Sequence, residues 1–304
     1  MQRRLMMGGL AAVAGVLIVG AAAWALSQGL IGPHGRAKHL LIVAQQAMRR
    51  HEWPSAQANL ERLINTFPDS PVTAEGLLAL GQVHEQQQQL VEGRAMYRVL
   101  LERFPDSSLA KDAQARLGAL NVALQFSPTI TDTDLAYAVA PGDTLAEIAA
   151  AHHTTIELLK RANGLTRDVI HPRQQLKVPK GTLTIVVDKS QNQLLVTENN
   201  QFFKAYTVAT GANNSTPVGT FKIINKIANP VWYRQGAVVP PESPDNILGT
   251  RWMGWDKQGY GIHGSVDPSA MGHQVTAGCV RMTNADVEEL FALVPMGTEV
   301  TVVD

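Results

Sequence analysis

The sequence predicts a multidomain chain with four parts in succession: an N-terminal transmembrane helix, an all-α region, a small α+β domain and a mainly-β domain. Three observations support this order. An uncharged apolar run lies near the start, a helical pattern repeats with a period of 37 residues, and from Thr182 onward apolar and polar residues alternate. The predicted parts are 1–27 for the transmembrane helix, 37–120 for the helical region, 121–135 for a linker, 136–179 for the α+β domain and 182–304 for the mainly-β domain.

The predicted transmembrane helix is the apolar run from Leu5 to Leu26, which contains no charged residue and follows Arg3 and Arg4. At a helical rise of about 1.5 Å per residue, it is long enough to cross a hydrocarbon core of about 30 Å. Positive charge before the run predicts a single-pass anchor in the cytoplasmic membrane, with the rest of the chain outside. A cleaved signal peptide is the main alternative, because Ala23–Ala25 fits a small-residue cleavage site, and a twin-arginine export signal is another.

The helical region contains a repeat. Residues 56–70 match residues 93–107, both segments end in Phe-Pro-Asp-Ser, and apolar residues three and four apart indicate amphipathic helices. Proline ends one helix in each unit, and Ser70 or Ser107 is expected to cap the next. The predicted helices are 37–51, 53–67, 71–87, 90–104 and 108–120.

This pattern resembles the tetratricopeptide repeats, whose helix pairs stack into an array. The resemblance implies a concave face that binds a peptide or protein segment. The alternative is a spacer that lifts the rest of the chain off the membrane, because two repeats and a closing helix are near the minimum for a stable array. The sequence does not identify a protein partner for this region.

The small α+β domain is predicted by a strand, two helices and a strand within a short stretch. Thr144 and Glu147 form a capping box before the first helix, and Thr154 and Glu157 form one before the second. The order resembles a LysM domain, which implies binding of glycans that contain N-acetylglucosamine. The alternative is a spacer between its neighbours. The implied groove lies near Gly142–Leu145 and Val169–Arg173.

The last domain is predicted to be mainly β with one helix packed on it. Asn284 is expected to cap that helix, because an Asn side chain can accept from the free N–H groups of a first turn. The predicted elements are strands at Thr184–Asp188, Gln193–Thr197, Phe202–Ala209, Gly219–Ile224 and Gly297–Val303, and a helix at Asn284–Leu293.

Cys279 is the single cysteine of the chain, and it is a candidate nucleophile. The thiolate is the nucleophilic form of cysteine, and a nearby imidazole is the usual means of producing it near neutral pH. His263 lies sixteen residues upstream, far enough for a loop to bring it back to the thiol. Outside the cytoplasm, a lone thiol is either reactive or an intermolecular link. The alternative is that Cys279 is a small buried apolar residue without a chemical role.

Neighbouring residues could complete a catalytic site. Gly261, Gly264 and Gly278 let the backbone approach a substrate, and the N–H groups near Gly278 and Cys279 are candidate donors to an oxyanion. Arg281 lies two residues after Cys279, so on a strand it would point to the same side and could bind a substrate carboxylate; a structural ion pair is the alternative. His273, between the two segments, is expected to be a loop residue.

The segments Gly261–Ser265 and Thr276–Met282 together resemble the active-site signature of L,D-transpeptidases of the YkuD type, and the resemblance extends over residues 182–304. The family more often has Ser-His where this chain has Thr276-Ala277, and it usually has Thr at Ser265. Thr276 and Ser265 each keep a hydroxyl, so we expect tuning of activity. Further matches, in the order of the family, are Thr184–Asp188, Asn192–Val196, Thr210–Gly211, Thr216–Phe221, Asn229–Trp232 and Gly249–Met253.

The resemblance implies a mixed β-sandwich and cysteine chemistry without a metal or cofactor. Cys279 would attack a peptide carbonyl and form a thioester, His263 would take the thiol proton, and a backbone carbonyl would orient the imidazole. The other implied roles are Gly278 and Ser265 as oxyanion or assisting residues, Arg281, Thr276 and Gly264 as substrate-binding residues, and Trp232, Trp252 and Trp255 as cleft walls or core.

The implied substrate is peptidoglycan. The acyl donor would be a tetrapeptide stem cut between diaminopimelate and the terminal D-alanine, and the acceptor would be the side-chain amine of another diaminopimelate, which gives a 3–3 cross-link. Passing the thioester to water or to a protein amine would instead make a hydrolase or a protein-attaching enzyme. A non-enzymatic cell-wall scaffold is the remaining alternative. Because the formal net charge is +0, no overall basic excess points to nucleic acid.

Overall fold

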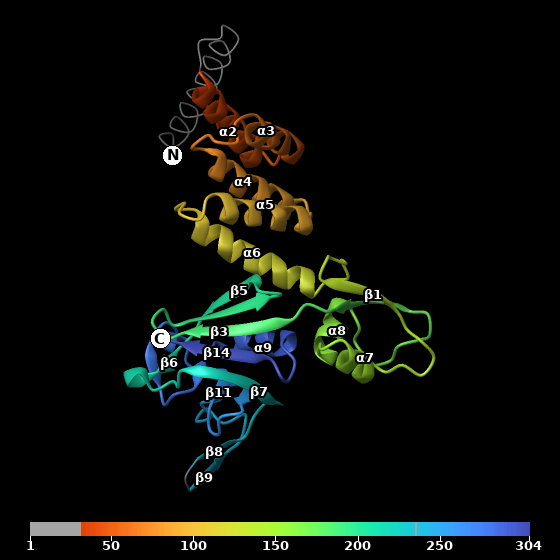
Figure 1. The fold of residues 1–304 in the computed structure, drawn as a ribbon, viewed down its shortest axis with the longest axis vertical. Helices are drawn as coiled ribbons and strands as arrows, with labels where there is room; N and C mark the ends of the chain where they lie inside the picture. Colours follow the sequence, from red (N-terminus) through yellow and green to blue (C-terminus); the bar gives the residue numbers. More distant parts are fainter. Residues whose placement is uncertain (1–31, 235) are drawn as a thin grey trace, which may run out of the picture. The chain divides into compact units, whose positions relative to one another are not determined.

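The computed structural model describes residues 32–234 and 236–304, and these residues divide into two compact units with the boundary between Leu120 and Asn121 (Figure 1). The transmembrane helix expected within residues 1–27 lies outside the described residues and stays a prediction. Within the described part of the chain, no helix is both long and apolar enough to cross a bilayer.

The first unit is a succession of helices that pack as neighbours along the chain. Small residues let them approach closely: a Cβ on Gly81 would lie 2.3 Å from Cε1 of Tyr97, so the buried tyrosine ring occupies the space that a larger side chain would need. The helices are α2 (Pro33–Arg49), α3 (Trp53–Thr66), α4 (Thr73–Gln86), α5 (Leu90–Arg103) and α6 (Ala110–Gln125), the last continuing into the second unit.

The Phe-Pro-Asp-Ser turns do not cap helices through serine, so that prediction is wrong. Helix α4 begins at Thr73 without a side-chain cap, and Ser70 Oγ is buried with no hydrogen-bond partner. Thr73 Oγ1 fastens the turn instead, because it donates to the Phe67 carbonyl at 2.7 Å. Ser107 Oγ accepts from Leu109 N at 3.2 Å, before α6 begins.

The small α+β domain pairs its two strands in antiparallel register around two short helices. The first capping box is confirmed: Thr144 accepts from Glu147 N, and the Glu147 side chain accepts from Thr144 N. The second box is not formed: Thr155 caps the helix alone by accepting from Leu158 N, and buried Thr154 Oγ1 has no partner. The elements are β1 (Asp134–Ala138), α7 (Leu145–Ala151), α8 (Ile156–Ala162) and β2 (Gln175–Pro179).

In the described part of the last domain, the main sheet has eight strands in the order β13-β11-β10-β7-β14-β3-β4-β5. Most neighbours are antiparallel, but β14 pairs with β3, and β11 with β13, in parallel. The strands of this sheet are β3 (Leu183–Asp188), β4 (Gln193–Glu198), β5 (Gln201–Thr207), β7 (Gly219–Ala228), β10 (Arg251–Trp255), β11 (Gly261–His263), β13 (Val280–Arg281) and β14 (Glu299–Val303).

Two small strand pairs lie outside the main sheet. One joins β6 to β12 in parallel, and the other is an antiparallel hairpin of β8 and β9. The elements outside the main sheet are β6 (Thr210–Gly211), η1 (Ala212–Asn214), β8 (Trp232–Arg234), β9 (Ala237–Val239), η2 (Pro268–Ala270), β12 (Gln274–Thr276) and α9 (Asn284–Leu293).

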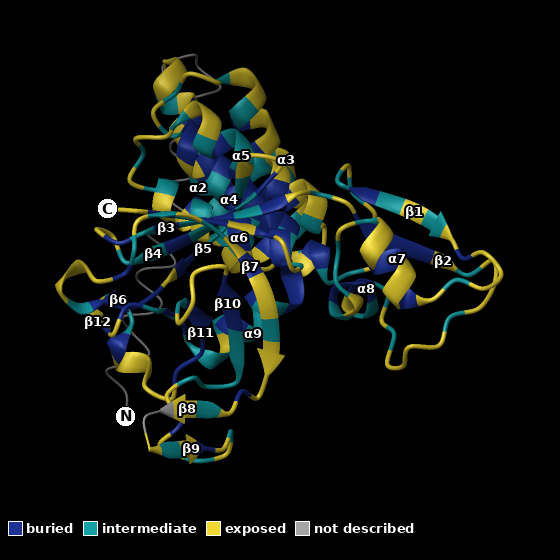
Figure 2. Cartoon of the chain, turned by 60° about the horizontal axis from the view of Figure 1, so that its bottom comes forward, coloured by how far each residue is buried: buried dark blue, intermediate teal, exposed yellow. Residues whose placement is uncertain are grey.

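Helix α9 packs against the sheet, where buried residues gather into one core (Figure 2). Val287 and Leu290 have no exposed surface. The helix covers Asn284–Leu293, as the sequence predicts, but its cap is Thr283, whose side chain accepts from Asp286 N. The prediction that Asn284 caps the helix is therefore wrong.

Helix α8 of the α+β domain docks on α9 of the mainly-β domain, and both lie in the second unit. Thr155 Oγ1 accepts from Leu158 N and also donates to the Ala292 carbonyl at 2.6 Å. Leu158 is buried in the core of the mainly-β domain. One hydroxyl thus caps α8 and ties the two domains together.

We predict that Thr155→Ala destabilises the second unit by about 2 kcal/mol, because the cap and the interdomain bond each contribute about 1 kcal/mol. Thr144→Ala is the matched control, since Thr144 caps α7 without that second bond, and it should cost about 1 kcal/mol. Urea unfolding of the full chain measures both losses. Equal losses would show that the bond to Ala292 stabilises nothing.

Candidate active site

A cleft of about 470 Å³ brings together four of the residues predicted for catalysis or binding: His263, Thr276, Cys279 and Arg281. The rest of the lining is largely apolar. It consists of Ile227, Pro230, Val231, Trp232, Tyr233, Ile247, Leu248, Trp252, Gly259 and Ala277.

The parallel pairing of β11 with β13 creates this site. His263 ends β11 and lies opposite Arg281, while Ile262 lies opposite Val280. Cys279 directly precedes β13, so the pairing places the thiol near β11, the strand that ends with His263. Met282 N donates to the His263 carbonyl at 2.9 Å and extends the contact.

Cys279 is half-buried, and its sulfur contacts backbone groups of Gly259 and of Gly261, the first residue of β11. The thiol donates to the Gly259 carbonyl at 3.5 Å, and the Gly261 N–H hydrogen-bonds the sulfur. Burial raises the pKa of the Cys279 thiol, which outweighs the opposite effects of the Gly261 N–H and the Arg281 charge. The resting group is a neutral thiol rather than the thiolate that the sequence led us to expect.

The His263 imidazole is 3% exposed and is held by its own chain. Nδ1 lies 2.7 Å from the Gly264 carbonyl oxygen. Because a carbonyl only accepts, Nδ1 carries the proton and Nε2 keeps its lone pair. The partner of the imidazole is thus a backbone carbonyl, as the resemblance implies.

The imidazole is neutral at physiological pH. Burial lowers the pKa of His263 to about 4, with a further lowering by the Arg281 charge and an opposing effect of the Gly264 hydrogen bond. The Trp252 ring stacks on the imidazole with centroids 6.0 Å apart. The dyad is a neutral thiol beside a neutral base, so the thiol proton must move during the attack itself.

Arg281 lines the cleft without an ion-pair partner among residues 32–234 and 236–304, and its buried Nε makes no hydrogen bond. Within this described part of the chain, the structural ion pair that was the alternative from the sequence is not formed. An unpaired guanidinium in a cleft is suited to a carboxylate, which it can bind in a bidentate manner.

Thr276 shapes the turn that presents the nucleophile. Its Oγ1 donates to the Cys279 carbonyl at 2.6 Å and accepts from Gly278 N at 3.2 Å. The Gly278 N–H would have to leave this bond to reach an oxyanion. Gly278 itself has φ +131°, and a Cβ there would lie 2.8 Å from Cε1 of Tyr260, so this position requires glycine.

Ser265 does not line the cleft, although it was expected to assist catalysis. Its Oγ accepts from Asp267 N and donates to the Asp267 carbonyl, both at 3.0 Å, and the residue is 5% exposed. The hydroxyl therefore closes a local turn. Gly264 contributes its carbonyl to His263 and is likewise absent from the cleft lining.

The tryptophans divide between the two predicted locations. Trp232 and Trp252 line the cleft, whereas Trp255 is buried in the core and stacks on Phe221 with centroids 5.0 Å apart. His273 lies exposed in the loop before β12, as expected.

Sequence reasoning missed the groups that hold the reactive pair. Gly259 and Gly261 contact the sulfur only through backbone atoms, which leave no signal in residue type. Asn284 accepts from Thr250 N and Ser265 N, while its position at a helix start suggested a cap instead. Gly249 and Gly264, which approach the Asn284 side chain, were the available sequence signal for these contacts.

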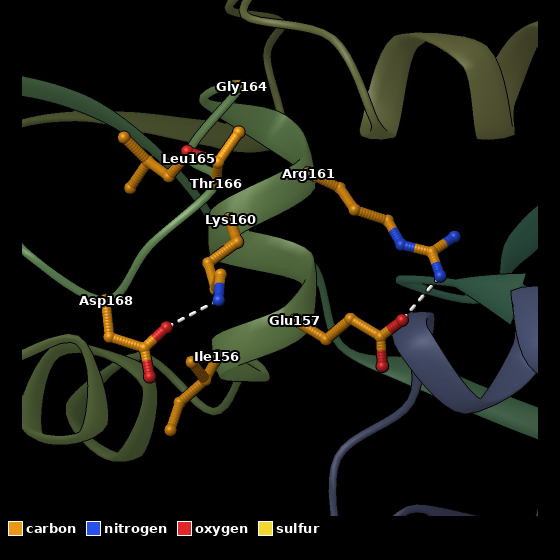
Figure 3. A pocket seen from close by; sticks show the side chains of 8 residues that line it. All are labelled: Ile156, Glu157, Lys160, Arg161, Gly164, Leu165, Thr166 and Asp168. Atoms are coloured by element: carbon orange, nitrogen blue, oxygen red, sulfur yellow. Dashed lines mark hydrogen bonds and ion pairs between the residues drawn. The ribbon is translucent and has the colours of Figure 1, made fainter.

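Another hollow lies along α8 of the α+β domain, and Figure 3 shows its lining. Its charges are paired with each other: Lys160 with Asp168 and Arg161 with Glu157, both at 2.5 Å. Its lining contains no cysteine or histidine and none of the residues of the loops predicted to bind glycan, although Asp168 directly precedes one of those loops. In the described part of the chain, no group of three or more His, Cys, Asp or Glu residues could hold a metal ion. The cleft at Cys279 is therefore the candidate active site.

Three family models match the chain: the L,D-transpeptidase catalytic domain (YkuD) over residues 182–302, the LysM domain over residues 137–179 and a tetratricopeptide repeat over residues 75–107. Together with the cysteine site they define an acyl-transferring enzyme whose chain also carries a LysM domain and helical repeats.

Related proteins match more than half of the chain. The "Putative L,D-transpeptidase YkuD" of Bacillus licheniformis is 36% identical over 176 residues, which are 55% of this chain and 98% of that protein. The protein of the same name in Bacillus subtilis is 35% identical over 55% of this chain and 98% of its own length. The chain therefore belongs to the L,D-transpeptidase family.

Solved structures include an L,D-transpeptidase from Mycobacterium tuberculosis H37Rv, with 15% identity, a TM-score of 0.36 and coverage of 45% of this chain and 75% of that one.

We predict that iodoacetamide labels Cys279 slowly at pH 7 and that the rate still rises above pH 9. Only the thiolate reacts, and burial holds the thiol pKa above its ordinary value, so the reactive form gains population late in the titration. Mass spectrometry against pH measures the rate, and Cys279→Ala, which leaves no thiol, gives the background. A plateau reached below pH 7 would instead demonstrate a preformed thiolate–imidazolium pair.

Proposed function

We propose that this enzyme forms 3–3 cross-links in peptidoglycan through a thioester on Cys279. The observation that carries the proposal is the cleft itself, where the single thiol of the chain shares a wall with a neutral, backbone-tethered imidazole. The acyl donor is the carbonyl of diaminopimelate in a tetrapeptide stem. The acceptor is the side-chain amine of diaminopimelate in a second stem.

The neutral dyad supports a cycle of proton transfers. As Cys279 Sγ attacks the carbonyl, His263 Nε2 takes the thiol proton and then gives it to the amine of the departing D-alanine. In the second half, the incoming amine attacks the thioester and loses its proton to the same nitrogen, and the released thiolate regains it. A base with a pKa near 4 stays unprotonated between cycles at neutral pH.

The oxyanion is assigned to the Cys279 N–H. Among the described residues no acceptor takes this amide, whereas the Gly278 N–H is bonded to Thr276 Oγ1. A free backbone donor on the nucleophile itself lies close to the charge that develops on the attacked carbonyl.

Arg281 binds the carboxylate of the terminal D-alanine in this proposal. That carboxylate lies one residue beyond the attacked carbonyl, and Arg281 lies two residues beyond the nucleophile on the cleft side of β13. Among the residues described the guanidinium forms no ion pair, although the Asp267 carboxylate is near enough for the two charges to interact.

The other parts of the chain would hold the catalytic domain close to peptidoglycan. The LysM domain binds glycan strands that contain N-acetylglucosamine, through the loops at Gly142–Leu145 and Val169–Arg173, and the helical repeats bind a protein partner. The apolar run of residues 5–26 anchors the chain in the cytoplasmic membrane with the catalytic domain outside. Protease protection of the full chain in membrane vesicles tests this orientation.

We predict that a carbapenem adds its mass to the intact protein once and that Cys279→Ala abolishes the adduct, because the thiol is the single group here that forms a stable thioester-type product. Intact mass spectrometry under reducing conditions measures the adduct. An unlabelled wild-type protein would favour the scaffold interpretation.

Incubation with purified tetrapeptide stems then separates the reaction types. Cross-linked dimers in the muropeptide profile are the expected product. Tripeptides without dimers would show that water accepts the acyl group, which would make the chain a hydrolase and overturn the transfer step.

We predict that Arg281→Met raises KM for a tetrapeptide stem about 10- to 100-fold with a smaller change in kcat, since a charge-assisted hydrogen bond contributes about 1.5–3 kcal/mol. Arg281→Lys should be intermediate, because an ammonium cannot bind in a bidentate manner. A stem amidated at its C-terminus is the matched control. Amidation should raise the KM of the wild type and leave the KM of the Met variant unchanged. Equal weakening of both proteins would place the carboxylate elsewhere.

A further inference from the structure

Asn284, the first residue of α9, connects the helix to two loops beside the cleft. Its Oδ1 accepts from Thr250 N at 3.1 Å and from Ser265 N at 3.2 Å, with Thr250 Oγ1 at 3.5 Å. The helix does not need this side chain for capping, because Thr283 already accepts from Asp286 N. The carbonyl oxygen of Asn284 is thus free to organise backbone from outside its own element.

Two glycines make room for this oxygen. A Cβ on Gly249, which has φ +62°, would lie 2.3 Å from Oδ1, and a Cβ on Gly264 would lie at the same 2.3 Å. Real side chains do not tolerate such contacts, so both loops approach Asn284 because they have glycine there. The backbone at Gly249 and Gly264 thus leaves the Asn284 side chain little freedom to move.

The peptide bond between Gly264 and Ser265 transmits the restraint to the imidazole. Its N–H donates to Asn284 Oδ1, and its C=O accepts from His263 Nδ1 at 2.7 Å. A trans peptide is planar, so fixing the direction of its N–H fixes the direction of its C=O. Donation from the N–H also polarises the carbonyl and strengthens it as an acceptor.

We propose that Asn284 is the positioning residue of the catalytic base: through one rigid peptide unit, it orients His263 and holds the tautomer that leaves Nε2 unprotonated. The catalytic part of this inference rests on the proposed function, in which His263 is the base. Asn284 is not among the residues that line the cleft. In other sites a carboxylate or amide side chain orients the imidazole by direct contact, whereas Asn284 does so through the Gly264–Ser265 peptide.

The test compares three variants of the full chain. Asn284→Leu keeps the approximate volume and removes the acceptor. Asn284→Asp keeps an acceptor oxygen at a helix N-terminus that tolerates negative charge. Thr283→Ala is the matched control, because it removes the cap of the same helix and leaves the bonds of Asn284 intact.

Two readouts are needed. The rate of acylation by a saturating carbapenem reports on the base. We expect Asn284→Leu to lower this rate about 100-fold, because a small misplacement of a catalytic group costs about that factor. The half-saturating carbapenem concentration should change little. The ¹⁵N-histidine spectrum reports on position: the exchange-protected Nδ1–H of His263, assigned with His263→Gln, should disappear in Asn284→Leu. Asn284→Asp and Thr283→Ala should keep both the signal and a rate within about 5-fold of wild type.

An unchanged signal and rate in a folded Asn284→Leu protein would overturn the proposal. So would an equal loss of rate in Thr283→Ala, which would reduce the effect to helix stability. Loss of the Nδ1–H signal without loss of rate would support the positioning by Asn284 and overturn the assignment of His263 as the base, so the two ideas fail separately.

Discussion

The parallel pairing of β11 with β13 is the constraint on which the site depends. It joins only two residues on each strand, yet it sets His263 opposite Arg281 and carries Cys279 to the edge of the same sheet. The rest of the fold supports that short contact: β10 holds β11 from the other side, and α9 packs beneath the sheet. A nucleophile and a base that are sixteen residues apart can share a cleft because the sheet fixes both ends of the intervening loop.

Burial decides the chemistry of the pair. A thiol and an imidazole in water exchange a proton readily near neutral pH, and that expectation follows from residue types alone. In the protein, loss of solvent raises the pKa of Cys279 and lowers the pKa of His263, and both shifts favour the uncharged forms. The unpaired Arg281 acts in the same direction on the imidazole. The charge of the cleft is thus concentrated in one guanidinium, facing an otherwise apolar wall.

The sequence predicted regular elements well and contacts between elements poorly. Helix Asn284–Leu293 is correct at both ends, and the helices of the repeat region agree within a few residues, because periodicity and turn residues are local signals. The caps assigned to Ser70, Thr154 and Asn284 are wrong. Each of these residues can cap a helix, but Thr155 and Thr283 cap two of the helices instead and α4 has no side-chain cap, and only the folded backbone decides between adjacent candidates.

The sequence by itself determined the order of elements in the described part of the chain and the identity of the reactive residues, because the single cysteine and the motif around it are covalent facts. The tertiary structure decided which side chains face the cleft: it placed Trp252 in the wall and Trp255 in the core, closed Ser265 into a turn and directed Asn284 toward two loops. The physical reason is that burial and hydrogen-bond direction belong to pairs of distant segments, and neither is encoded in one segment alone.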